Sequence, residues 1–301
     1  MIIGISGKAG SGKDTIGNII QYILVQQDIL KTQPTWEVDF GVAAYTKAGY
    51  EDWLLFGVGA RYGNSSFVIK KFADKLKDIV CLLIDCTRED LEDSRFKETP
   101  IGKEWIVWYY THYKLITNNS DGRISPYFSS KEEAMTYNFP KLSDTYLWGK
   151  DAEGVGIQTR ILTPRLLMQL IGTEAGRNII HPNIWVNALM NKYKEKFISG
   201  GIGMFHDPRP SYKSLGFPNW IITDVRFLNE VEAIIKHNGL LIRVNRTVKE
   251  DTIPNHISEL ELDNYNDWNY VIENNSTIDN LITELRMILE RERISITGKV
   301  L

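Results

Sequence analysis

The chain has 301 residues, and its 35 lysines and arginines nearly balance 38 aspartates and glutamates, which leaves a net charge of −3 at pH 7. A chain without a basic excess lacks the electrostatic signature of a nucleic-acid-binding protein, so we expect a small-molecule substrate and no nucleic acid. No apolar run reaches the roughly 18 residues of a membrane span, and a strand pattern begins at Met1 in place of a signal peptide. We therefore expect a cytoplasmic protein without a membrane partner.

The first predicted element is a buried strand, residues 1–6, which runs directly into a glycine-rich segment of GxxxxGK pattern. An amphipathic helix pattern follows from Asp14 to about Gln26. Glycines in such a loop let backbone N–H groups approach a phosphate, and the helix N-terminus adds positive partial charge. The lysine of this pattern reaches the β- and γ-phosphates of a nucleotide. We therefore expect a phosphate-binding loop made by Gly7, Gly10, Ser11, Gly12, Lys13, Asp14 and Thr15.

The residue after Lys13 departs from the strict pattern, because Asp14 stands where a serine or threonine usually coordinates magnesium. Thr15 can supply the hydroxyl one position later, or Asp14 can act through an ordered water. The sequence leaves both open, and Asp14 and Thr15 are our candidate Mg²⁺ ligands. A mere glycine-rich turn with a lysine nearby is the alternative, which the strand before the segment and the helix after it argue against.

A second strand at 67–69 and a helix at 73–85 follow a stretch without a clear period. Lys77 falls on the polar face of this helix, where a solvated lysine is the default interpretation. Cys81 and Cys86 are five residues apart in the helix pattern, which separates their Cα atoms by roughly 8 to 9 Å, beyond the reach of a disulfide. We expect two core thiols.

Residues 101–160 contain eleven of the chain's 33 aromatic residues. The alternation in 105–115 predicts a two-faced strand, and turn residues followed by 124–128 predict a return strand. These patterns indicate a small α+β insertion. Its aromatic residues favour a local core over a platform for stacking bases.

Thr163 and Pro164 begin the next predicted helix as its N-cap and its first residue. Arg165, Gln169 and Thr173 follow at intervals of four residues and therefore share one polar face. This face presents an anion-binding guanidinium, an amide and a hydroxyl in one row.

The second half of the chain continues with a predicted helix at 183–197, a long loop at 200–218 and buried strands at 220–223, 240–244 and 271–272 that alternate with helices. This alternation predicts an α/β fold with a parallel, doubly wound sheet. Asp224 and Arg226 emerge at the carboxyl end of one strand, where open α/β sheets bind their ligands, although a structural ion pair is the alternative.

Taken together, these segments resemble the bacteriophage deoxynucleoside monophosphate kinases, which are P-loop kinases. The resemblance covers most of the chain outside 29–65 and 101–160. The segments that carry it are Gly7 to Thr15 with its Gly-Lys-Asp-Thr ending, Ala73-Asp74-Lys75-Leu76-Lys77, Arg165-Leu166-Leu167-Met168-Gln169 running into Gly172-Thr173-Glu174, Trp185-Val186, Asp224-Val225-Arg226 with Asn229-Glu230, His256-Ile257-Ser258-Glu259 and Asn274-Asn275.

The resemblance implies a nucleoside-monophosphate-kinase-like sheet in two parts, 1–100 and 161–301, interrupted by the insertion 101–160. It implies transfer of the γ-phosphoryl group of ATP to a deoxynucleoside 5′-monophosphate with Mg²⁺. Lys13, Asp224 and Arg226 would be catalytic, and Arg246 is a candidate for a lid over the donor. The residues implied on the acceptor side are Lys77, Arg95, Arg165, Gln169, Gly172, Thr173, Trp185 and Asp224.

Two other functions stay open at this point. One is a kinase for another small phosphorylated acceptor, of the phosphomevalonate or dephospho-coenzyme A type. The other is a nucleotide-binding module without kinase activity, which a convergent row of acceptor-side cations argues against. The sequence does not reveal which bases are accepted, how ribose is excluded, what the insertion does or whether the chain forms a homodimer.

Overall fold

The computed structural model describes residues 1–32, 45–56, 67–110, 127–128, 157–200, 211–247 and 260–294. The chain divides into two compact units, of which the larger combines Met1–Lys75 with Asn183–Leu301 and the smaller is Leu76–Pro182. Within the ranges described, no helix has both the length and the apolar character needed to cross a membrane. The division 1–100, 101–160 and 161–301 stays a prediction.

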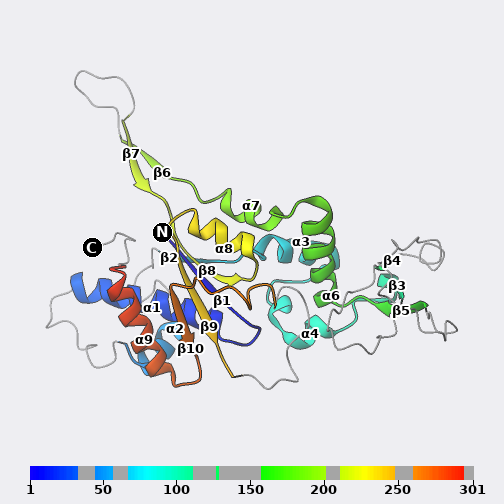
Figure 1. The fold of residues 1–301 in the computed structure, drawn as a ribbon, viewed down its shortest axis with the longest axis horizontal. Helices are drawn as coiled ribbons and strands as arrows, with labels where there is room; N and C mark the ends of the chain where they lie inside the picture. Colours follow the sequence, from blue (N-terminus) through cyan, green and yellow to red (C-terminus); the bar gives the residue numbers. More distant parts are fainter. Residues whose placement is uncertain are drawn as a thin grey trace. The chain divides into compact units, whose positions relative to one another are not determined.

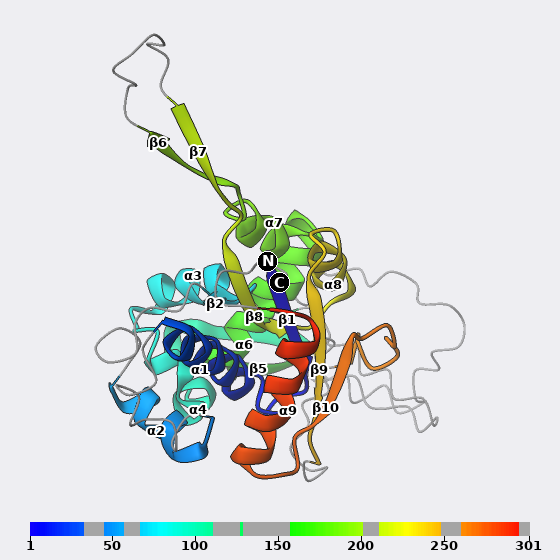
Figure 2. The ribbon, with the colours of Figure 1, turned by 90° about the vertical axis from the view of Figure 1, so that its left-hand side faces the viewer.

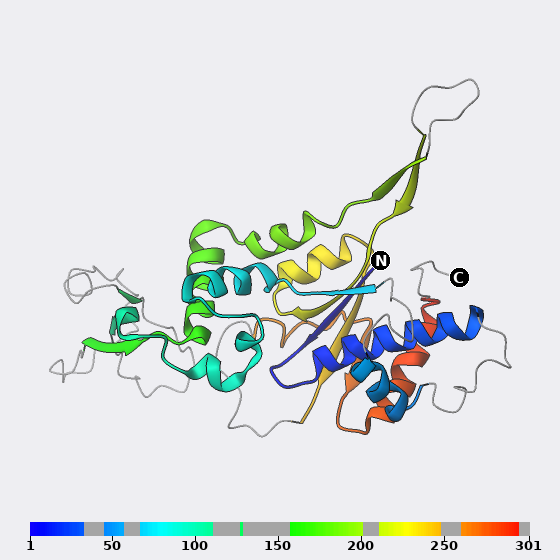
Figure 3. The same cartoon turned by 180° about the vertical axis from the view of Figure 1, so that it is seen from behind.

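The larger unit is built on a five-stranded sheet in which every pair of neighbouring strands is parallel. The first strand lies at its centre, between β9 and β8 (Figures 1 and 3). This arrangement confirms the predicted parallel α/β sheet. In spatial order the strands are β10 (Tyr270–Glu273), β9 (Leu240–Asn245), β1 (Ile2–Gly7), β8 (Asn219–Val225) and β2 (Phe67–Lys70).

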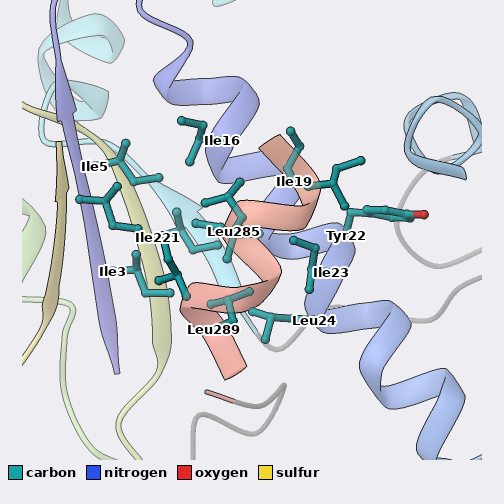
Figure 4. Close-up of a cluster of buried hydrophobic side chains, with 14 of the residues drawn as sticks. Ile3, Ile5, Ile16, Ile19, Tyr22, Ile23, Leu24, Ile221, Leu285 and Leu289 are labelled. Carbon is teal, nitrogen blue, oxygen red and sulfur yellow. The ribbon is translucent and has the colours of Figure 1, made fainter. Parts of the chain in front are cut away.

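Three helices cover one face of this sheet: α1 (Lys13–Thr32), α2 (Lys47–Phe56) and α9 (Ile278–Arg291). Successive side chains of a strand point to opposite faces, so Ile3 and Ile5 of β1 both point toward these helices. Figure 4 shows them packed with residues of α1 and α9, all buried in one cluster.

Two helices pack against the opposite face: α7 (Ile184–Met190) and α8 (Leu228–Ile235). Their apolar residues join Ile2 and Ile222 in a second buried cluster. A Cβ added at Gly4 would lie 2.6 Å from Ile234 Cδ1, so glycine in β1 allows α8 to approach the strand closely. Both faces of the sheet are therefore buried, as expected for parallel strands.

The helix predicted over 183–197 is too long. In the structure α7 ends at Met190, Tyr193 packs with its ring centroid 4.9 Å from that of Trp220, and the chain then enters β6 (Lys196–Gly200). This strand pairs with the antiparallel β7 (Ser211–Gly216), so the loop predicted over 200–218 also contains a strand. The two strands form a ribbon that extends away from the five-stranded sheet (Figure 2).

The smaller unit contains most of α3 (Asp74–Ile84), followed by α4 (Ser94–Glu98), α6 (Pro164–Gln169) and a π-helix (Leu170–Ile180). Two short 3₁₀ turns occupy Asp90–Glu92 and Lys103–Trp105. A three-stranded antiparallel sheet has the order β4 (Tyr127–Phe128), β3 (Ile106–Tyr110) and β5 (Ile157–Ile161). The pairing of β3 with β4 confirms that the chain returns as an antiparallel strand, whereas β5 was not predicted.

The helix α3 confirms the predicted element, whose apolar spacing predicts that Leu76, Ile79, Val80 and Leu83 face inward. Leu76 and Val80 are buried, whereas Ile79 and Leu83, which share the helical period, are exposed. Cys81 and Cys86 are free thiols, as predicted, but both are only half-buried and do not belong to a core. Burial and the neighbouring Cys81 raise the pKa of the Cys86 thiol to about 11, so it stays protonated near neutral pH.

Leu285 of α9 is fully buried against the sheet, and Met287 of the same helix is 58% exposed. We expect Leu285→Ala to lower the free energy of unfolding by about 2 to 5 kcal/mol, because it removes buried methyl groups and leaves a cavity. Met287→Ala, the matched control, should change it by less than about 0.5 kcal/mol. Urea titration followed by circular dichroism measures both, and equal effects would contradict the packing described for α9.

Candidate functional site

The glycine-rich segment forms a loop between the end of β1 and the start of α1, as the sequence predicts. Gly10 and Gly12 have φ angles of 74° and 96°, which favour glycine over other residues. The Ser11 N–H donates to Lys8 O at 3.1 Å, which closes a turn inside the loop. The first N–H groups of α1 have no acceptor within the helix, so the end of the loop presents backbone donors. This arrangement suits an anion.

The side chain of Lys13 folds back over the loop. Its Nζ donates to Gly7 O at 2.6 Å and to Lys8 O at 2.7 Å, and the residue is only 9% exposed. Burial lowers the pKa of Lys13 to about 7, and the positive charges of Arg226 and Arg243 act in the same direction. An anion beside this ammonium would stabilise its charged form.

One polar atom of the loop lacks a protein partner. Ser11 Oγ is buried and, in the part of the chain that the structure describes, makes no hydrogen bond. A Cβ added at Gly7 would lie 2.5 Å from both Ser11 Oγ and Val244 O, so this wall of the loop tolerates no side chain. A Cβ at Gly10 would meet nothing within 4 Å. The unsatisfied Ser11 hydroxyl therefore has bonding capacity left for a phosphate oxygen.

Asp14 faces the neighbouring strands. Its Oδ1 accepts a hydrogen bond from Thr223 Oγ1 at 2.6 Å, and Lys71 Nζ lies 3.0 Å from its carboxylate. Burial alone would raise the pKa of the Asp14 carboxyl, but the Thr223 hydroxyl and the Lys71 charge together hold the pKa below its usual value. Thr15 is half-buried on the next position of α1. The carboxylate of Asp14 is thus ionised at neutral pH.

Asp224 lies at the carboxyl end of β8, where the sequence predicts it. Its Oδ1 accepts from Phe72 N–H at 2.8 Å and its Oδ2 from Ala73 N–H at 2.9 Å. Burial raises the pKa of this carboxyl, and the two backbone hydrogen bonds oppose that rise. The carboxylate therefore holds the connection between β2 and α3, which also carries Lys71, the cation that reaches Asp14.

Arg226 follows β8 and turns into α8. Its backbone N–H donates to Glu230 Oε2 at 2.7 Å, which fixes the start of that helix. Its charge lowers the pKa of Lys13 and also acts on Asp224, so the guanidinium contributes to the field of the loop. The structure thus brings together Lys13, Asp14, Asp224 and Arg226.

The connection between β10 and α9 supports the loop from the other side. Asn274 Nδ2 donates to Ser11 O at 2.8 Å, and a Cβ at Gly12 would clash with the same amide. Asn275 Oδ1 accepts from Thr247 N–H at 2.8 Å. The neighbouring Arg246 is exposed, and its lid role stays a prediction because 248–259, with His256 and Glu259, lies outside the described residues.

Two cations predicted on the acceptor side each have a carboxylate partner in the smaller unit. Lys77 Nζ lies 2.5 Å from Glu92 Oε1, and Arg165 Nε pairs with Glu98 Oε1. Arg95 Nε lies 3.9 Å from Asp93 Oδ1, and the Arg95 side chain is 92% exposed, so this third pair is looser. An acceptor phosphate would have to replace a carboxylate at each of these three predicted positions.

The polar row predicted on one helix is only partly present. Thr163 Oγ1 accepts from Leu166 N–H at 3.3 Å, so the predicted N-cap is confirmed. Arg165 and Gln169 share the α-helix α6, but Thr173 lies in the π-helix, whose wider turn changes the angular spacing. Gly172 is buried there, and a Cβ would lie 2.8 Å from Leu76 Cδ2.

Trp185, predicted to bind the acceptor, lies on α7 in the larger unit and is 4% exposed. Its role stays a prediction, as do those of the other site residues. Sequence reasoning missed two residues that contact Asp14, namely Lys71 and Thr223. Thr223 directly precedes Asp224 at the end of the strand, so its sequence position could have indicated a place in the site. No sequence pattern indicated that Lys71 would contact Asp14.

Comparison with known proteins gives consistent matches. A family model described as "Deoxynucleotide monophosphate kinase" matches residues 148–285. The "Deoxynucleoside-5'-monophosphate kinase" of Escherichia phage T5 is 24% identical over 244 residues, which cover 80% of this chain and 74% of that protein. A "Putative deoxynucleotide monophosphate kinase" of Acanthamoeba polyphaga mimivirus is 29% identical over 152 residues, or 48% of this chain and 71% of that protein.

The chain is therefore similar to deoxynucleotide monophosphate kinases, over 148–285 for the family model and over 80% of its length for the phage T5 enzyme. This confirms the resemblance drawn from the sequence. The span that matches the family model begins well after the phosphate loop and includes Arg165, Trp185 and Asp224. The loop and the family match are therefore two separate observations on different parts of the chain.

The low pKa of Lys13 gives the loop a testable proton linkage. A bound triphosphate should raise that pKa from about 7 toward its usual value, so above pH 7 the complex carries more protons than the free protein. Triphosphate affinity should therefore fall as the pH rises above about 7. Calorimetry near pH 8 in two buffers of different ionisation enthalpy should show uptake approaching one proton.

The Lys13→Met variant is the control for this linkage, because it should bind weakly and take up no proton through this side chain. The assignment to Lys13 would be contradicted if the unmodified protein took up no proton on binding. It would also be contradicted if Lys13→Met took up as many protons as the unmodified protein.

Proposed function

We propose that this protein transfers the γ-phosphoryl group of ATP to deoxynucleoside 5′-monophosphates and so supplies deoxynucleoside diphosphates for DNA synthesis. The observation that carries the proposal is the phosphate loop at the carboxyl end of the central strand, in a chain whose residues 148–285 match the model of this kinase family. Phosphoryl transfer needs positioned charges more than covalent chemistry, and the loop supplies them.

On the donor side, the triphosphate lies along the loop. Backbone N–H groups of Gly12, Lys13 and Asp14 and the unsatisfied Ser11 hydroxyl bind its oxygens. Lys13 leaves the carbonyls of Gly7 and Lys8 and donates to the β- and γ-phosphates. Arg226 adds positive charge where negative charge develops on the transferred group.

The residues at the start of α1 fit a magnesium ion that arrives with the nucleotide. Mg²⁺ keeps several waters and takes one or two protein oxygens together with phosphate oxygens, and Asp14 and Thr15 offer a carboxylate and a hydroxyl. When bound, the ion neutralises phosphate charge. Lys71 and Thr223 keep the Asp14 carboxylate ionised and oriented for this role.

For the acceptor monophosphate we assign roles from the family resemblance. Arg165 and Lys77 bind its phosphate by exchanging their present carboxylate partners, Glu98 and Glu92. Asp224 orients the connection after β2 through two backbone hydrogen bonds. The remaining acceptor-side residues are Arg95, Gln169, Gly172, Thr173 and Trp185.

We further propose that the protein acts in the cytoplasm of the cell in which its DNA precursors are used, without nucleic-acid or membrane partners. Both named relatives are viral, so a host cytoplasm is the expected place. We propose a homodimer as its assembly, which sedimentation of the purified chain tests.

The function is tested by a coupled assay of diphosphate production over the four deoxynucleoside and four ribonucleoside monophosphates. We expect ATP consumption that depends on an added deoxynucleoside monophosphate. ATP hydrolysis without such dependence, or activity only with a different phosphorylated acceptor, would contradict the proposal. The same assay defines which bases and sugars are accepted.

Lys13→Ala should abolish phosphoryl transfer and leave the fold intact, because the Lys13 ammonium donates to backbone oxygens of the loop and not to the core of the sheet. Lys47→Ala, which removes an exposed lysine paired with Glu51 on α2, is the matched control and should retain activity. Turnover near that of the unmodified protein in Lys13→Ala, with a native circular dichroism spectrum, would rule out the donor site.

Arg165→Met should weaken acceptor use by roughly 10- to 150-fold, because a charged hydrogen bond contributes about 1.5 to 3 kcal/mol. ATP affinity should be nearly unchanged. Arg88→Met is the control, since Arg88 also pairs with a carboxylate of the smaller unit, Asp78 at 3.0 Å. The measurements are kcat/KM for the deoxynucleoside monophosphate at saturating ATP, the Kd for ATP and the melting temperature.

Equal losses for donor and acceptor together with a lower melting temperature would assign Arg165 to stability alone.

A further inference from the structure

A second arginine lies beside the phosphate loop on the strand next to it. Arg243 of β9 is the register partner of Ser6 of β1, and Ser6 directly precedes the loop. Arg243 Nη1 donates to Ser6 Oγ at 3.1 Å, and Nη2 donates to Asp263 Oδ1 at 3.2 Å. The guanidinium is thus fixed at the carboxyl end of the sheet by a hydroxyl and a carboxylate.

The same carboxylate also binds the loop itself. Asp263 Oδ2 lies 2.9 Å from Lys8 Nζ, and the backbone oxygen of Lys8 accepts from Lys13 Nζ. One carboxylate therefore joins a cation of the loop to a cation of the neighbouring strand. Because the residues it joins come from β9, the loop and the turn at 260–263, its position sets the distance between two positive charges at the loop.

An aromatic ring restrains the guanidinium further. Arg243 Cζ lies 5.6 Å from the centroid of the Trp268 ring, within the range of a cation–π contact. Trp268 is itself held, because its Nε1 donates to Tyr265 O at 2.8 Å and its ring meets that of Tyr265 edge to face. The Arg243 side chain is only 13% exposed. Little conformational entropy remains for it to lose on binding a ligand.

This restrained arginine retains binding capacity. A guanidinium has five N–H donors, and its bonds to Ser6 and Asp263 use two of them within the described part of the chain. Arg243 is in register with Ser6 of β1, and Lys13 Nζ donates to the backbone oxygens of Gly7 and Lys8, which directly follow Ser6, so both cations lie at the same end of β1. Cations held near one another favour a ligand with several negative charges, and a chain of phosphates is such a ligand.

We propose that Arg243 is a further phosphate-binding residue of the donor site, and that Asp263 is the residue that positions Arg243 and Lys8 for the triphosphate. The proposal rests on the proposed function, since it concerns the same donor site. Asp263 contacts no phosphate in this arrangement and acts through the two cations.

The test measures binding of inorganic tripolyphosphate to the full-length chain by calorimetry, so that the phosphate contacts are separated from base, sugar and acceptor. Arg243→Met should weaken binding about 10- to 100-fold, and Arg243→Lys should recover only part of it, because an ammonium lacks the guanidinium fork. Asp263→Asn should weaken binding about 3- to 10-fold. In the Arg243→Met background, Asp263→Asn should weaken binding by a smaller factor than it does in the unmodified chain.

Arg286 of α9 is the matched control. It pairs with Glu290 at 2.9 Å, and its Cζ lies 4.9 Å from the Tyr45 ring, so Arg286→Met removes the same kinds of contact away from the loop. It should leave tripolyphosphate binding unchanged. Melting temperatures of all variants identify a loss that comes from unfolding, and Asp263→Asn serves as the milder test if Arg243→Met does not fold.

Unchanged binding in Arg243→Met would overturn the role of Arg243. Tighter binding in Asp263→Asn would overturn the positioning role, because it would mean that Asp263 competes with phosphate for the two cations. Failure of the proposed function is seen separately. A chain that binds tripolyphosphate through Arg243 but produces no nucleoside diphosphate would support the phosphate site and contradict the kinase activity.

Discussion

The phosphate loop has to stay open when no nucleotide holds it, and much of the larger unit meets this constraint. A segment with three glycines loses more conformational entropy on ordering than most sequences, so contacts from outside must fix it. Asn274 binds the backbone oxygen of Ser11, and Lys13 binds those of Gly7 and Lys8. The central position of β1, buried on both faces, gives these contacts a rigid base.

The second constraint is charge. Cations gathered at the end of a sheet repel one another unless carboxylates are placed among them, and the carboxylates here come from different elements. Asp14 of α1 pairs with Lys71, Asp224 of β8 faces the backbone before α3, and Asp263 pairs with Lys8. At the centre of the loop, burial lowers the pKa of Lys13, and the charges of Arg226 and Arg243 add to that effect. An incoming phosphate chain supplies the missing negative charge.

The elements with local signals could be predicted from sequence. Strand, glycine-rich loop and helix follow one another within the first 26 residues, and Thr163 with Pro164 marks a helix start that the structure repeats. The helix predicted to Phe197 failed because Tyr193 and Phe197 share a helical period. In the structure Tyr193 packs on Trp220 and Phe197 begins a ribbon, and a distant strand is invisible to a local pattern.

The residues that complete the site were beyond such reasoning for the same reason. Asn274 meets Ser11 across 263 positions, and Asp263 meets Lys8 across 255, so neither contact leaves a spacing that a motif could record. The π-helix likewise replaces the α-helical spacing that placed Thr173 with Arg165. Hydrophobic periodicity predicts which residues face a core, but it does not predict which carboxylate will contact which cation.

The strength of the ion pairs indicates how such a site can respond to its substrates. Pairs such as Lys77 with Glu92 and Arg165 with Glu98 join a cation to a carboxylate that is about half exposed, and exposed pairs contribute only about 0.2 to 1 kcal/mol. A charged hydrogen bond to phosphate contributes about 1.5 to 3 kcal/mol, so exchanging a carboxylate for a phosphate is favourable even after the pair is broken. In the acceptor site that we propose, the carboxylates would keep the cations ordered and neutralised until a nucleotide binds, without holding them tightly enough to exclude it.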